Sequence, residues 1–312
     1  MSGVGTTGSP IDGPATSSVV EGETTPLVRA VRIATAAWLV GAVVAGAVRA
    51  AATNASGKAA LVDGMILTQV ALAAILILLG SLVEGFGFGL SLGTHWPYTR
   101  NIFVLALQGD PEAAHRITAT LVGLLAVALV VLHPNSATIS GLVLVIATAL
   151  LGMGTLHVLA GRLPSFVHGM HGLLAYGVLL CYLVVFAGHG GGLWVYVGDT
   201  PALHAVLLAA FLGGMTTGQR GFGSPIGAFY VPMRSSQWVT IVHLVSALAV
   251  VATLGWLMPK YQAAFYIAVG QILIGFLLFH AVNLKPKSPG IIVAFHQSMA
   301  LAITVAIVAV RS

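Results

Sequence analysis

The chain has 312 residues, of which 58% are hydrophobic and only 7% are charged. Soluble domains carry about 25% charged residues, so this composition excludes a soluble globular protein and indicates an integral membrane protein. The single cysteine, Cys181, excludes an internal disulfide, and the net charge is +5. We therefore expect membrane lipid, and no nucleic acid, as the main surroundings of the chain.

The chain begins with a polar segment and continues as a series of apolar runs. Residues 1–26 are rich in Gly, Ser, Thr and Pro, which cannot bury a core, so we predict a disordered tail there. Each later run of about 20 residues can cross the bilayer, and only a helix pairs its own backbone groups in lipid. The predicted spans are 27–48, 62–83, 112–132, 137–159, 167–187, 201–217, 238–258, 261–283 and 291–310.

The first span, within 27–50, stands apart from the other eight. Arg29 and Arg32 lie at its start and small residues follow it, which also fits an uncleaved signal-like anchor. We predict an extra N-terminal transmembrane helix here. The other eight spans divide into two groups of four, at 62–188 and 201–310.

The last eight spans contain an internal repeat. The stretch "GSLVEGFGFG" at 80–89 corresponds to "GMTTGQRGFG" at 214–223. Four spans separate the copies, so both copies enter the membrane in the same direction. We predict an all-α integral membrane protein with two pseudo-symmetric four-helix transmembrane bundles, comparable with the parallel repeats of transporters.

Four histidines occupy matching positions in the two copies. They are His115 and His171 in the first half and His243 and His296 in the second. Each lies one to two turns inside a helix that starts on the same membrane face, so the imidazoles are expected at one depth. Ionisable residues inside a span are functional candidates by default. Two facing histidines in a four-helix bundle are typical axial ligands of a heme, whereas zinc usually takes three or four ligands.

The first half has an acid that the second half lacks. Glu112 precedes His115 by three residues, which places both on one helix face, whereas Thr240 holds the matching position in the second half. A carboxylate there can accept protons, fix water or stabilise positive charge on a reacting carbon. The structural alternative is an acid favoured by the helix macrodipole. The asymmetry indicates that one half performs chemistry and the other holds a permanent redox cofactor.

Arginines are concentrated on the face where the histidine helices start, and Arg116 and Arg220 are among them. Heme propionates need cationic partners, so these two are candidate propionate contacts. The positive-inside rule explains the same excess and would make this face cytoplasmic. Both explanations stay open at this point.

At these residues the chain resembles the heme A synthase family, membrane enzymes that oxidise heme O to heme A for cytochrome oxidase. The stretch "GSLVEGFGFGLSLGTHWP" at 80–97 is similar to the family's Gly-rich segment followed by Trp-Pro. "EAAHR" at 112–116 is similar to its Glu-x-x-His-Arg motif, and "HGLLA" at 171–175 to its His-x-Leu-Leu-Ala motif. "VHLVSA" and "HQSMA" resemble the segments around its second-half histidines.

The resemblance covers about 62–310 and has two departures. Many bacterial members carry a cysteine pair in the first outer loop, which this chain lacks, and the helix at 27–50 is not part of the family's eight. The family places the Trp-Pro loop outside the cell membrane, in contrast to the arginine count.

The resemblance implies a role for each of the five singled-out residues. His115 and His171 would bind the substrate, heme O, with Glu112 as the catalytic carboxylate. His243 and His296 would bind a resident heme b that passes electrons. The reaction would be successive hydroxylation of a ring methyl group, which becomes a formyl group after loss of water. The partners expected for this function are heme O synthase, an unidentified electron donor and a second copy of the chain.

Two other functions use the same features. A diheme b-type electron-transfer subunit would need the four histidines but not Glu112. A transporter built on the repeat would need neither heme. Bound hemes, or their lack in purified protein, distinguish the three.

Overall fold

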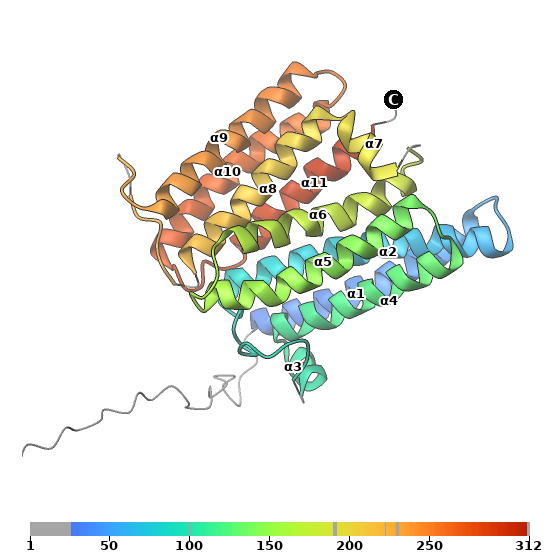
Figure 1. Ribbon diagram of the computed structural model, residues 1–312, viewed down its shortest axis with the longest axis horizontal. Coiled ribbons are helices and arrows are strands. Elements are labelled where there is room, and N and C mark those ends of the chain that lie inside the picture. Colours follow the sequence, from blue (N-terminus) through green and yellow to red (C-terminus); the bar gives the residue numbers. More distant parts are fainter. Residues whose placement is uncertain (1–25, 100, 190–191, 222, 229–230, 311–312) are drawn as a thin grey trace, which may run out of the picture.

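The computed structural model describes residues 26–99, 101–189, 192–221, 223–228 and 231–310 (Figure 1). Every regular element in this part of the chain is a helix, which confirms the all-α class. Eight of the helices described are long and apolar enough to cross a membrane, so the protein is a multi-pass membrane protein. The predicted tail, 1–26, lies outside the described residues except for Pro26.

The helices follow the predicted order, with two short additions. They are α1 (Pro26–Ala52), α2 (Gly57–Phe86), α3 (Ile102–Gln108), α4 (Pro111–Leu132), α5 (Ser136–Leu159), α6 (Phe166–Phe186), α7 (Gly192–Gly198), α8 (Pro201–Arg220), α9 (Ser235–Trp256), α10 (Gln262–Leu284) and α11 (Ile292–Val308). The helix at the ninth predicted span, α11, has 17 residues and is the shortest of the long helices. That length reaches the lower limit of about 17 residues for a bilayer crossing.

Local sequence explains where several helices begin and end. Asp110 caps α4 by accepting a hydrogen bond from the Ala113 amide at 2.9 Å, and Pro111 occupies the first helical position. Gly87 ends α2 with a φ of +74°, a conformation that glycine adopts without steric cost. α2 is longer than the predicted span at 62–83, because the helix continues beyond the apolar run into segments that contain Lys58 at one end and Glu84 at the other.

The long helices pack as two groups of four. α2, α4, α5 and α6 contact one another in the first half, and α8, α9, α10 and α11 do so in the second. The halves meet where α6 packs against α8 and α2 packs against α11 (Figure 1). α3 and the connection from α8 to α9 lie at the same end of the molecule, where the histidine-bearing helices begin.

The extra helix, α1, packs along α2. Gly46 of α1 and Gly64 of α2 approach so closely that a Cβ on either would overlap the opposite helix. Small residues at such contacts let the backbones of transmembrane helices approach closely and pack against each other. Arg49 and Asp63 form an ion pair of 2.8 Å at one end of the contact. The rest of α1 presents exposed apolar side chains such as Val40.

Candidate functional site

Three of the four repeat-related histidines are held in the same way. The Nδ1 atom of each donates a hydrogen bond to a backbone carbonyl of the preceding helix of its bundle. A carbonyl only accepts, so Nδ1 carries the hydrogen and the Nε2 lone pair of the neutral ring is available to a ligand. The pairs are His115 with Leu76, His171 with Thr148 and His243 with Ala209, each at 3.0 Å.

A glycine lies beneath each of the four imidazoles. In the three hydrogen-bonded cases it follows the carbonyl residue by four positions, one turn along the same helix. A Cβ at any of these glycines would lie 3.2–3.3 Å from the imidazole Cε1, closer than side chains normally pack. The glycines are Gly80 under His115, Gly152 under His171, Gly213 under His243 and Gly275 under His296. The ring positions therefore depend on the absence of a side chain there.

His296 departs from this pattern in one respect. Its Nδ1 is buried and has no hydrogen-bond partner among the residues that the structure describes. The residue four positions before Gly275 is Gln271, whose side-chain Nε2 donates to the His296 carbonyl at 3.4 Å. The carbonyl-bound arrangement is therefore complete in the first half and only half complete in the second.

The histidines form two pairs across the interior of the bundles. The ring centroids of His243 and His296 lie 6.4 Å apart, with the ring planes inclined at 71°. A metal–imidazole bond is about 2 Å long and the ring centre lies roughly 1 Å beyond the nitrogen, so two axial ligands place their centroids about 6 Å apart. His115 and His171 are close enough to interact electrostatically. The described residues include no group of three or more His, Cys, Asp or Glu that could hold a metal, so each pair could offer a metal two such side chains at most.

The glycines correct the register of the repeat. The sequence motifs align Gly80 with Gly214, whereas the contacts with His115 and His243 make Gly80 equivalent to Gly213. The motif alignment is wrong by one residue because the packed glycine is nine residues from the end of the motif in the first half, at Gly89, and ten in the second, at Gly223.

Glu112 is buried in the first turn of α4 and belongs to a closed network. Its Oε1 accepts a hydrogen bond from Arg116 Nη2 at 2.5 Å, and the two side chains are only 5% and 9% exposed. Its Oε2 accepts from the Ser91 hydroxyl at 2.9 Å and from the Leu92 amide at 3.1 Å. The hydrogen bonds of Glu112 in the described region thus go to Arg116 and to the α2–α4 connection, and none goes to His115.

The second half replaces this acid with an amide at a different position. Thr240, which matches Glu112 by sequence, bonds back to the Ser236 carbonyl at 2.7 Å. The buried Gln237 instead accepts from the amides of Met233 and Arg234 and donates to the Ile226 carbonyl. The second half therefore fixes its own connection with a neutral amide, whereas the first half uses the carboxylate of Glu112.

The two candidate propionate contacts both bind connecting segments. Arg116 Nη1 donates to the carbonyls of His95 at 2.5 Å and Pro97 at 3.3 Å. Arg220 donates from Nε to the Ser224 carbonyl at 3.2 Å and from Nη2 to the Pro286 carbonyl at 3.0 Å. Each guanidinium retains one nitrogen without a described partner, Nε in Arg116 and Nη1 in Arg220, so a propionate contact remains a prediction.

A polar cluster at the junction of the halves was missed by the sequence analysis. Glu84 of α2 binds His168 of α6 at 2.9 Å and accepts from the Thr217 hydroxyl of α8 at 3.1 Å. His168 is three residues before His171, and Thr217 is four residues after Gly213. The signal that could have found it is an acid at the end of an apolar run, which is a functional candidate by default.

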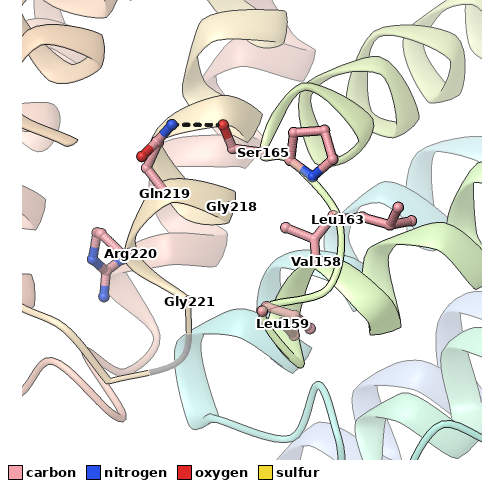
Figure 2. A pocket seen from close by; sticks show the side chains of 10 residues that line it. Val158, Leu159, Leu163, Ser165, Gly218, Gln219, Arg220 and Gly221 are labelled. Atoms are coloured by element: carbon pink, nitrogen blue, oxygen red, sulfur yellow. Dashed lines mark hydrogen bonds between the residues drawn. The ribbon is translucent and has the colours of Figure 1, made fainter. Parts of the chain in front are cut away.

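A cavity of about 370 Å³ lies beside this junction, between the turn that joins α5 to α6 and the C-terminal end of α8 (Figure 2). Ser165 accepts a hydrogen bond from Gln219 at 2.9 Å along its edge, and the Arg220 side chain points away from Leu163 on the other wall. None of the four paired histidines lines this cavity.

In comparisons with known proteins, no family model, no curated protein and no solved structure matches this chain.

Proposed function

We propose that the chain is a heme A synthase-like membrane oxidoreductase that converts a methyl group of heme O to the formyl group of heme A. The observation that supports this most is the repeated histidine geometry. Three imidazoles bind a carbonyl through Nδ1, all four rest on a glycine, and the two halves place them in pairs. A hydrogen bond from Nδ1 fixes the tautomer and orientation in which Nε2 binds a metal.

The residues present fit a heme in each half, which His115 and His171 would hold in the first half and His243 and His296 in the second. The centroids of His243 and His296 are 6.4 Å apart, a separation at which both imidazoles could hold one iron, and the glycines leave room that a Cβ would fill. Bound heme would supply a redox-active iron. We assign His243 and His296 to a resident heme b, and His115 and His171 to the substrate heme O.

Glu112 is the residue to which we assign the chemistry on the substrate. Its carboxylate lies in a buried, low-dielectric site, where a fixed charge stabilises a developing positive charge more strongly than it would in water. Arg116, Ser91 and Leu92 hold it in one orientation, so it needs no reorganisation during the reaction. Each of two successive hydroxylations would insert one oxygen atom and remove two electrons from the methyl carbon, so the reaction also requires an external oxidant. The geminal diol would then lose water to give the formyl group.

One observation favours a second function, a diheme b-type electron-transfer subunit without chemistry on heme. Both carboxylate oxygens of Glu112 are already bound, which is also what a purely structural ion pair requires. The histidine pairs would serve either function.

The variant Glu112→Gln separates the two functions. The amide oxygen can still accept from Ser91 and Leu92, so the variant is expected to fold and to bind both hemes. We expect production of heme A from heme O to fall about 100-fold or more, the scale of loss when a preorganised electrostatic stabiliser is removed. The measurement is the mass of the hemes extracted from cells that express each form, with the absorption spectrum of the purified protein as the control for heme binding.

Two results would contradict the proposal. One is wild-type protein with two non-exchanging b hemes and no heme A, which would favour the electron-transfer subunit. The other is undiminished heme A production by Glu112→Gln.

A further inference from the structure

The connection from α2 to α4 presents an apolar surface that no described helix covers. α3 reads "IFVLALQ", and no charged residue lies between Arg100 and Asp110. Phe103 is 68% exposed, Val104 52% and Leu107 69%. These three side chains, named here the outer face of α3, make a short helix with its apolar side turned outward.

The opposite side of α3 is fixed to the candidate site. Ile102 is buried against Leu92 and Ala113 in a small cluster separate from the main core. Leu92 also donates its amide to Glu112. The helix therefore cannot turn its outer face inward without losing the packing that positions the connection beside Glu112.

The position of α3 places the outer face at the membrane boundary. Only Gly109 and Asp110 separate α3 from the start of the transmembrane helix α4. Arg32, in the first turn of the span of α1, donates from Nη1 to the Leu107 carbonyl at 2.9 Å. Seven helical residues measure only about 10 Å, so the whole of α3 lies within that distance of the boundary.

The residues around α3 are those of a membrane interface. Trp96 and Tyr98 of the same connection are exposed, and such aromatic residues gather at the level of the lipid headgroups. Next to Arg32, the exposed Ile33 belongs to the lipid-facing surface of α1. The outer face of α3 thus continues the apolar surface that the spans present to lipid.

We propose that α3 is an interfacial anchor whose outer face inserts into the boundary between lipid headgroups and acyl chains. A short helix of this kind lies in the plane of the membrane with its apolar side about 5–10 Å deep. Lipid is the occupant because the surface is uncharged, joins the lipid-facing surface of α1 and lies on a helix that ends two residues before a span. The anchor goes beyond the proposed function and does not depend on heme.

A single nitroxide label tests this in the full-length protein in phosphatidylcholine vesicles. The only native cysteine, Cys181, is fully buried, so a label at Phe103→Cys is specific. Leu124→Cys, on an exposed position within α4, is the hydrocarbon control. Ser224→Cys, exposed in the connection from α8 to α9, is the water control. Accessibility to oxygen is compared with accessibility to a water-soluble nickel chelate.

We expect the ratio of oxygen to nickel accessibility at position 103 to exceed that at position 224 several-fold and to approach that at position 124. Leu107→Cys should give the same result and stands in if the first variant does not fold. Nickel accessibility at positions 103 and 107 equal to that at 224 would overturn the anchor, because the outer face would then lie in water. An immobile label shielded from both reagents would also overturn it, since protein would then cover the face.

Discussion

At the level of single residues, the glycines beneath the imidazoles do as much as the histidines to define the candidate sites. A ring that donates from Nδ1 to a carbonyl is already oriented before any ligand arrives. The backbone supplies the carbonyl, and the glycine one turn later supplies the space. A backbone carbonyl or a glycine near a histidine is common by itself. Here the two occur together at three histidines, and the glycine occurs without the hydrogen bond at His296.

The variant Gly213→Ala tests the importance of that space. The new Cβ would lie 3.2 Å from His243 Cε1 and would tilt the ring away from its partner. We expect the affinity for the second-half heme to fall about 10-fold or more, the usual effect of disturbing a group that orients a ligand. Titration of the apoprotein with heme measures this affinity.

The matched control is Gly123→Ala in α4, where a Cβ would meet only Val145 at an ordinary distance of 3.9 Å. Equal heme affinity in the two alanine variants would show that the glycine contact does not position His243.

The candidate histidines could be predicted from the sequence because the repeat places them at matching positions in apolar runs. The contacts of Glu112 could not be predicted, since Ser91 lies in an irregular connection with no periodic pattern. The contact between Glu84 and His168 joins residues 84 positions apart on different helices. Only the packing of α2, α6 and α8 reveals it.

At the level of helices, the length of an apolar run predicts a span well where capping residues mark its ends. The run at 112–132 became α4 within one residue, because Asp110 and Pro111 define its start. α3 and α7 were not predicted, since seven-residue apolar stretches between spans carry no clear helical period. Their helical form depends on packing against the ends of longer helices.

The close contact of α1 with α2 gives a test of the extra helix. A Cβ in Gly64→Ala would overlap the Gly46 carbonyl oxygen and lie 2.9 Å from the Ala50 Cβ. We expect the free energy of unfolding in detergent to fall by about 1–3 kcal/mol, the usual cost of overpacking, while heme content stays unchanged.

The control is Gly41→Ala in α1, where a Cβ meets nothing within 4 Å. Alanine favours the helix more than glycine does, so this variant is expected to lose no stability. A loss as large as that of Gly64→Ala would mean that the α1–α2 contact does not determine the effect.

At the level of the whole molecule, the two halves share a plan and differ in charge. Both hold a histidine pair near the end where the connections gather, but among the residues that the structure describes only the first half has a buried ion pair beside it. Glu84 joins the halves by binding His168 of α6, three residues before His171, and Thr217 of α8, four residues after Gly213. On this difference in charge rests our proposal of one reacting site and one permanent site, connected through α6 and α8.

The claim on which this account depends is that the four histidines act as two pairs. The measurement is the number of low-spin hemes per chain after the apoprotein is reconstituted with excess heme, for the wild type and for alanine variants at His115, His171, His243, His296 and, as control, His133. We expect two in the wild type and in His133→Ala, and one in each of the other four, with the members of a pair losing the same signal. A wild type without heme, or a variant of any of the four that keeps both signals, would contradict the account.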